Sequence, residues 1–123
     1  MTDGGATGKL VLVIEDNVDA GDSLADVLEL SGHRVVVARD GMSGIAKARE
    51  VKPDVVLCDI GLPDVNGYEV ARELRRDPEL SAVRLIALSG YAQPEDRARA
   101  REAGFDAHLS KPPRLEQLDA MLG

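Results

Sequence analysis

The chain has 123 residues, of which 44% are hydrophobic and 30% charged, as is typical of a folded domain and not of a disordered segment. Its net charge of -7 argues against a nucleic-acid-binding surface, because phosphate backbones require positive charge. No apolar run approaches the roughly 20 residues that a membrane-spanning helix needs, so no membrane association is expected. The single cysteine, Cys58, rules out an internal disulfide and favours a reducing cytoplasm.

The start of the chain lacks the apolar region of a signal peptide, so residues 1–8 are predicted to be a flexible lead-in to one domain over residues 9–122. Strands are predicted where apolar residues form short continuous runs, at residues 10–14, 34–38, 55–58, 83–88 and 107–109. Helices are predicted between these runs, from Val18 to a stop at Gly32, from the cap Asp40 to about Glu50, from Gly67 to Arg76, from Pro94 to Gly104, and from Pro112 and Pro113 to the end.

The apolar faces of these helices differ in strength. The first is expected to carry Val18, Leu24 and Leu28, and the last Leu115 and Leu118. The helix at residues 94–104 has only alanines as apolar residues, so it is expected to be the least firmly held element. Five repeats of strand and helix predict an α/β fold: a single doubly wound, five-stranded parallel sheet with helices on both faces and residues 107–109 at its edge.

Polar residues gather at the predicted carboxyl ends of the strands, where sites form in open parallel sheets. Three acids held together repel one another unless a cation lies among them, and Mg2+ is the usual choice where phosphate also binds. A lysine, a hydroxyl and an unobstructed backbone N–H complement a phosphoryl group. The residues concerned are Glu15, Asp16, Asp59, Ser89, Gly90 and Lys111.

Four segments at these strand ends resemble the receiver domain of two-component response regulators: VLVIEDN, VVLCDIGLPDVNGYE, IALSGY and AHLSKP. The resemblance covers nearly the whole chain, and the sequence is most similar to receivers associated with hybrid histidine kinases. It implies a flavodoxin-like sheet with strand order 2-1-3-4-5.

The resemblance also implies roles for the acidic residues. Asp59 matches the phosphoacceptor aspartate, and Asp16 and Asp59 match direct ligands of Mg2+ or Mn2+. The backbone carbonyl of Gly61 would complete the protein's ligands, with Glu15 acting through water. Glu15 departs from the family pattern, in which aspartate is commoner at this position.

The phosphoryl-binding roles follow from the same resemblance. Lys111 matches the lysine that pairs with the phosphoryl group, and the backbone N–H groups of Ile60 and Gly90 are expected to donate to it. Ser89 matches the switch residue, and Lys111-Pro112 resembles the family's cis peptide. His108 stands where the family's aromatic switch residue is usual, and we interpret it as a half-buried strand residue in that altered switch position.

These matches predict a phosphorylation-activated signalling switch in a phosphorelay. Its partners would be a histidine kinase or histidine phosphotransfer protein and a downstream effector protein or domain. It would turn over only its own phosphoryl group and would not be an enzyme. Two alternatives are a phosphorylation-independent interaction module and an aspartyl-phosphate phosphotransferase. The second is disfavoured because Gly61 stands where phosphatases of the haloacid-dehalogenase type place a second acid.

Several neighbouring residues have simpler interpretations. Asp54 and Asp64 are expected to be turn residues, and Cys58 to be a core residue. The arginines at positions 97, 99 and 101 are expected to form a solvated helix face, with a partner surface as the minority alternative. The lifetime of the phosphoryl group is expected to depend on Gly61 and Tyr91.

Overall fold

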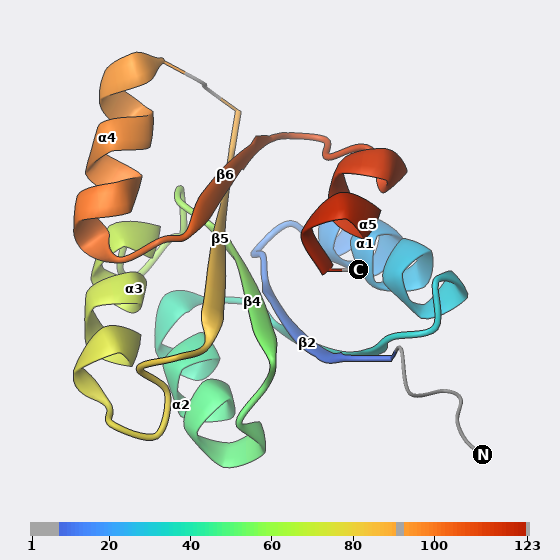
Figure 1. Cartoon of the computed structure of the whole chain (residues 1–123), viewed down its shortest axis with the longest axis horizontal. Helices are drawn as coiled ribbons and strands as arrows, with labels where there is room; N and C mark the ends of the chain where they lie inside the picture. The colour runs from blue at the N-terminus through green and yellow to red at the C-terminus, as the bar shows by residue number, and fades with distance from the viewer. Residues whose placement is uncertain (1–7, 91–92, 123) are drawn as a thin grey trace.

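The structure is a computed structural model that describes residues 8–90 and 93–122. Within these residues five strands alternate with five helices (Figure 1). In chain order they are β2 (Leu10–Ile14), α1 (Val18–Leu30), β3 (Arg34–Ala38), α2 (Gly41–Val51), β4 (Val55–Asp59), α3 (Gly67–Arg76), β5 (Arg84–Ser89), α4 (Pro94–Ala103), β6 (Ala107–Ser110) and α5 (Leu115–Leu122). None of these helices is long and apolar enough to cross a membrane. The predicted lead-in lies almost wholly outside the described residues.

The strands form one parallel sheet in the order β3-β2-β4-β5-β6. This arrangement confirms the predicted strand order, including the edge position of the last strand. The helices α1 and α5 cover one face of the sheet, and α2, α3 and α4 cover the other (Figure 1). All carboxyl ends of the strands therefore lie along one edge of the sheet, where the predicted site is to be found.

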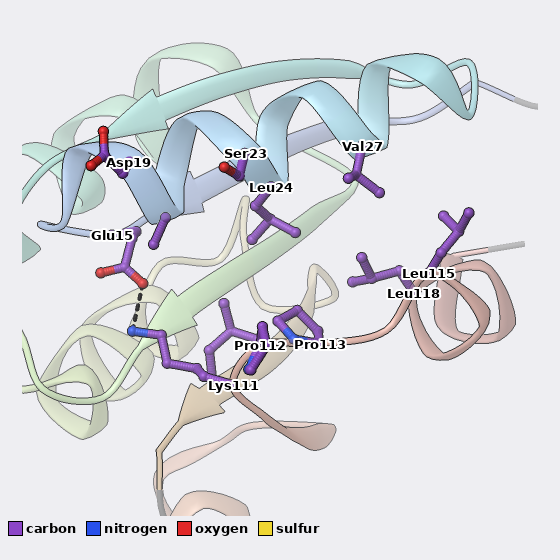
Figure 2. A pocket seen from close by; sticks show the side chains of 12 residues that line it. Glu15, Asp19, Ser23, Leu24, Val27, Lys111, Pro112, Pro113, Leu115 and Leu118 are labelled. Atoms are coloured by element: carbon purple, nitrogen blue, oxygen red, sulfur yellow. Dashed lines mark ion pairs between the residues drawn. The ribbon is translucent and has the colours of Figure 1, made fainter.

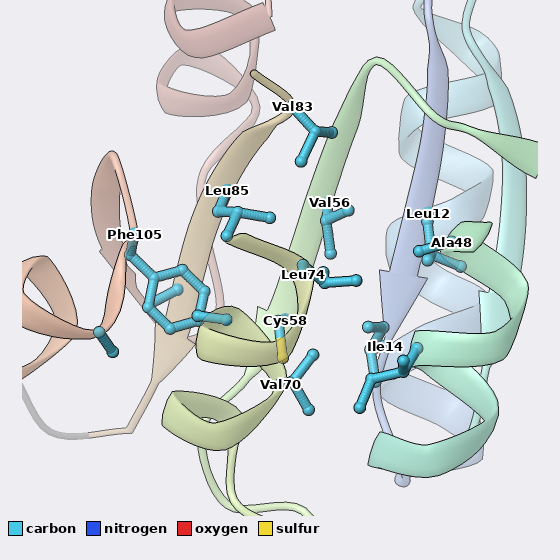
Figure 3. Packing of buried hydrophobic residues seen from close by; sticks show 14 of the residues in the cluster. Leu12, Ile14, Ala48, Val56, Cys58, Val70, Leu74, Val83, Leu85 and Phe105 are labelled. Carbon is cyan, nitrogen blue, oxygen red and sulfur yellow. The ribbon is translucent and has the colours of Figure 1, made fainter. Parts of the chain in front are cut away.

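Two apolar clusters hold these layers together, one on each face of the sheet. The larger cluster joins Leu12, Val56 and Cys58 of the sheet to α2, α3 and α4 (Figure 3). The smaller one joins the alternate residues of the same strands to α1 and α5. Burial raises the pKa of the Cys58 thiol, so this residue is a core residue, as predicted.

Most helix and strand boundaries agree with those predicted from the sequence. Asp40 caps α2 as predicted, by accepting the Ser43 N–H at 2.8 Å. The last helix begins at Leu115 and not at the proline pair, and the fourth strand is shifted by one residue, to Arg84–Ser89. Val18 is 55% exposed and Leu115 is 47% exposed, so neither belongs to the buried face of its helix.

An arginine near the end of α3 connects the start of β5 with the end of α4. The Arg75 guanidinium donates hydrogen bonds to the carbonyls of Gly104 and Val83 and to the Asp106 carboxylate, at 2.9, 2.6 and 2.9 Å. The same Asp106 oxygen accepts the Leu85 N–H at 2.9 Å. These bonds fix where β5 and β6 begin, and thus set the positions of the polar residues at their carboxyl ends.

Candidate metal and phosphoacceptor site

The carboxyl ends of β2, β4, β5 and β6 bring the predicted site residues together. Glu15 and Asp16 follow β2, and Asp59 ends β4. One carboxylate oxygen from each of these three acids lies within 4.8 Å of the other two. Ser89 ends β5, and its carbonyl accepts the Lys111 N–H at 2.9 Å, so the hydroxyl-bearing residue and the lysine lie on adjacent chains.

The Lys111 ammonium lies between two of the acids. Its Nζ is 2.6 Å from Glu15 Oε1 and 3.1 Å from Asp59 Oδ2, and Figure 2 shows the first of these ion pairs. Burial by itself lowers the pKa of Lys111, but hydrogen bonds to the two carboxylates raise it overall. The lysine is therefore a fixed positive charge beside the predicted phosphoacceptor.

Glu15 is almost completely buried, with 1% of its surface exposed. Burial raises the pKa of its carboxyl group, and the Lys111 and Asn17 hydrogen bonds oppose this rise. The Asn17 N–H donates to Oε2 at 3.1 Å, so each Glu15 oxygen has a hydrogen-bonding partner. Asn17 also caps α1 by accepting the Ala20 N–H. Sequence analysis missed this orienting role, although Asn next to a helix start is a capping signal.

Asp59 is 7% exposed and is held from both sides. Its Oδ1 accepts the Gly61 N–H at 3.1 Å, and its Oδ2 pairs with Lys111. The Ile60 N–H instead donates to the Leu88 carbonyl at 3.0 Å, as part of the pairing between β4 and β5. The backbone amide that donates to the Asp59 carboxylate is therefore that of Gly61. The sequence analysis expected the Ile60 N–H to face the phosphoryl group, but this N–H is engaged within the sheet.

Gly67, the first residue of α3, packs directly against the end of β4. A Cβ atom at this position would lie 2.7 Å from the Asp59 carbonyl oxygen and 2.8 Å from the Ile60 Cα. Only glycine allows α3 to begin so close to the end of β4. Gly90 differs, since a Cβ there would meet no atom within 4 Å among the described residues. The space in which a side chain at position 90 would lie is therefore open among the described residues.

The donor set suits a hard divalent cation. Asp16 is exposed, whereas the other two carboxylates are buried. Three carboxylates around one ammonium leave an excess of negative charge, which a cation with oxygen ligands neutralises. Mg2+ fits this set because it binds to a few carboxylates and keeps several of its waters.

His108 lies on the edge strand β6 and is half-buried, as predicted. Both of its ring nitrogens are buried and have no hydrogen-bond partner among the described residues. Burial lowers the pKa of this imidazole, and the positive charge of Arg97 lowers it further. Its place in a switch stays a prediction, and Tyr91, expected to influence phosphoryl lifetime, lies outside the described residues.

The remaining predictions concern residues around the site. The Lys111-Pro112 peptide is cis, as expected. Asp64 is more than a turn residue, because its carboxylate accepts the N–H groups of Gly41 and Met42, both at 2.8 Å, and thereby caps α2 from the loop after β4. The arginines of α4 are exposed as predicted, and the Arg99 guanidinium also lies 4.6 Å from the centre of the Tyr68 ring.

Comparison with known proteins gives the same assignment as this geometry. Residues 11–123 match the family described as the response regulator receiver domain. The chain is 38% identical over 119 residues to the polar-differentiation response regulator DivK of Brucella anthropi, a match that covers 94% of this chain and 97% of DivK. The chain therefore belongs to the response regulator receiver family of two-component signalling.

Two solved structures show how similar the fold is. The receiver domain of the Pseudomonas aeruginosa sensor histidine kinase PA1611, which has a magnesium ion coordinated in its active-site cleft, is 31% identical with a TM-score of 0.86, covering 94% of each chain. The chemotaxis protein CheY4 of Vibrio cholerae is 25% identical with a TM-score of 0.88, covering 94% of this chain and 96% of that one. These matches confirm the predicted receiver fold and its use as a signalling switch.

Proposed function

We propose that Asp59 accepts a phosphoryl group from a phosphohistidine of a histidine kinase or histidine phosphotransfer protein. The observation that carries this proposal is the Lys111 ammonium, held 3.1 Å from Asp59 Oδ2 within a cluster of three acids. An Asp59 oxygen attacks phosphorus while the bond from phosphorus to the histidine nitrogen breaks, and the neutralised imidazole leaves with the electron pair.

The other residues prepare this carboxylate and receive the charge of the phosphoryl oxygens. Lys111 pairs with one oxygen, and the N–H groups of Gly61 and Gly90 and the Ser89 hydroxyl donate to the others. Because the lysine must then loosen its contact with Glu15, phosphorylation alters the hydrogen bonds on both sides of the site. Ser89 and His108 transmit this change towards α4 and β6.

Asp16, Asp59 and the Gly61 carbonyl would hold Mg2+ or Mn2+, and the magnesium-bound relative supports this assignment. When bound, the cation neutralises the negative charge that develops on the transferring group. Both Glu15 oxygens already accept hydrogen bonds, which favours an indirect role for Glu15, through water, over direct ligation.

The switch unit is residues 9–122, and it works in the cytoplasm on protein partners. Its output passes to a downstream effector protein or domain, without contact to nucleic acid or membrane. The chain catalyses transfer to itself and loss of its own phosphoryl group, and has no multiple-turnover substrate. The three carboxylates beside a bound lysine favour this role over the phosphorylation-independent module.

Intact mass spectrometry after incubation with Mg2+ and acetyl phosphate tests the proposal. We expect one phosphoryl adduct that is lost in Asp59→Asn and in the presence of chelator. Asp54→Asn is the matched control, because its exposed carboxylate lies at the opposite end of β4, and it should keep the adduct. An adduct that survives Asp59→Asn would contradict the proposal. Absence of both the adduct and Mg2+ binding would favour the interaction module.

A further inference from the structure

A cavity of about 680 Å³ lies between α1 and α5 and is bordered at one end by Glu15 and Lys111 of the acidic site (Figure 2). Its size is within the range of roughly 300–1,000 Å³ that small-molecule sites occupy. Leu24 and Val27 of α1 form one wall, and Leu115 and Leu118 of α5 form the other. Lys111, Pro112 and Pro113 also line the cavity. An occupant with an apolar body would therefore be removed from water on more than one side.

The polar groups of this cavity lie at one end of α1. Asp19 and Ser23 are one helical turn apart and line the same cavity. Both are exposed, and the Asp19 carboxylate has no ion pair or hydrogen bond with any other described residue. Figure 2 shows this carboxylate at the end of the cavity that Glu15 and Lys111 also border.

The charged groups that line the cavity differ in whether another residue already pairs with them. The Lys111 ammonium points towards Glu15 and pairs with it and with Asp59, so its charge is already neutralised (Figure 2). Glu15 in turn has partners for both of its oxygens. The charge left unpaired at the cavity is therefore the negative charge of Asp19. The net charge of -7 on the whole chain acts in the same direction on a diffusing ligand.

We propose that this cavity, which we call the α1–α5 groove, binds a small organic cation with an apolar body. The apolar body lies between Leu24 and Leu118, and the ammonium pairs with Asp19 beside the Ser23 hydroxyl. The charge of Asp19 disfavours an anionic ligand, and a purely polar cation gains nothing from the leucine walls. The proposal does not depend on phosphorylation of Asp59.

A nitrogen-15 NMR titration of the full chain with 4-phenylbutylamine tests the groove. We expect saturable shifts of backbone resonances on facing sides of α1 and α5. The matched probes are 4-phenylbutan-1-ol, which lacks the charge, and 4-phenylbutyrate, which reverses it. We expect the alcohol to bind about two- to fivefold more weakly than the amine, because it lacks one exposed ion pair. We expect the carboxylate to bind more weakly than the alcohol, because Asp19 repels it.

Three variants locate the site. Asp19→Asn should weaken amine binding to the level of the alcohol. Asp26→Asn is its matched control, because it removes the same charge from an exposed position of α1 that does not line the groove, and should bind like the wild type. Ser23→Trp places a large side chain at an exposed lining position and should abolish binding without disturbing the core.

Four results would overturn the proposal. Absence of saturable shifts would leave the groove to a protein partner. Equal binding of the amine and the carboxylate, or equal effects of Asp19→Asn and Asp26→Asn, would show that Asp19 does not select a cation. Shifts of the groove resonances on dilution of the protein alone would show that a second copy of the chain occupies the groove.

Discussion

The Lys111 ammonium lies closer to Glu15, at 2.6 Å, than to the proposed phosphoacceptor Asp59, at 3.1 Å. Glu15 is also the more deeply buried of the two acids, with 1% of its surface exposed against 7%. Without a phosphoryl group, the lysine thus stabilises a buried carboxylate through a direct ion pair. The two contacts make the charge state of Glu15 depend on Lys111.

Replacing Lys111 by Met should raise the pKa of Glu15 above its wild-type value. Burial already raises this pKa, and the lysine is the largest influence that opposes the rise. In Lys111→Met the Glu15 carboxyl group then keeps its proton to a higher pH in the folded state than in the unfolded state. The protonated group therefore stabilises the folded variant at acidic pH, and this stabilisation is lost as the pH rises through the folded pKa of Glu15. Carboxyl-carbon NMR titration without divalent metal measures the shift. Lys111→Arg keeps the charge and should stay nearer to wild type; an unchanged Glu15 pKa in Lys111→Met would contradict the prediction.

Addition of Mg2+ should stabilise the wild-type chain, because the ion is expected to bind the folded acidic cluster and not the unfolded chain. Once the site is saturated, each tenfold rise in free Mg2+ should add about 1.4 kcal/mol to the free energy of unfolding. Thermal unfolding followed by circular dichroism measures this effect. Asp16→Asn should remove most of it, whereas Asp119→Asn, an exposed acid on α5, should not. An equal Mg2+ response in both variants would exclude the acidic cluster as the binding site.

Gly67→Ala should destabilise the chain by about 1–3 kcal/mol, the usual cost of forcing extra atoms into a packed site. The new Cβ would meet the backbone of Asp59 and Ile60, which flexible side-chain movement cannot relieve. Gly90→Ala is the matched control and should change stability by less than about 0.5 kcal/mol, because its Cβ meets no described atom. Urea denaturation of the two variants measures the difference, and equal stabilities would refute the close approach at Gly67.

The fold could be predicted from the sequence because each strand is a short apolar run and each helix carries its own signals. The β4 run is buried at all five residues, as a central strand covered on both faces must be. Positions near helix starts were harder to predict. Val18 fits the helical spacing but is the first residue of α1 and is exposed.

The site could be predicted as a set of residues but not as a network of bonds. Parallel strands place their carboxyl ends at one edge, so the grouping of Glu15, Asp16 and Asp59 follows from topology. Which amide faces Asp59 depends on the sheet register, and this register engages the Ile60 N–H with Leu88. Bonds between distant segments, such as those from Arg75 to Gly104 and Asp106, leave no periodic signal in the sequence.

Asp64→Asn should weaken the start of α2 and reduce the dependence of stability on acidic pH. Hydrogen bonds from the Met42 and Gly41 N–H groups hold the pKa of Asp64 below its ordinary value. A lowered folded pKa stabilises the chain above the unfolded pKa, and this stability is lost as pH falls through the folded pKa. Urea midpoints at neutral and acidic pH measure the effect. Asp119→Asn, on α5, is the control; if both variants lose the same stability with pH, Asp64 is not a cap.

His108→Phe should stabilise the chain by about 1 kcal/mol at neutral pH, because it removes two buried ring nitrogens that lack partners. Burial lowers the folded pKa of His108 below its ordinary value of 6.5, so wild-type stability present above this pH is lost as pH falls through the folded pKa. The stability of His108→Phe should not decline in this way as the pH falls.

His33→Phe is the informative contrast. The His33 Nδ1 accepts the Lys9 N–H at 3.1 Å, and the loss of this hydrogen bond should destabilise the chain. Denaturant unfolding between pH 5 and pH 7.5, roughly the range in which histidine titrates, measures both. If His108→Phe were less stable than wild type, the ring nitrogens must have partners in solution.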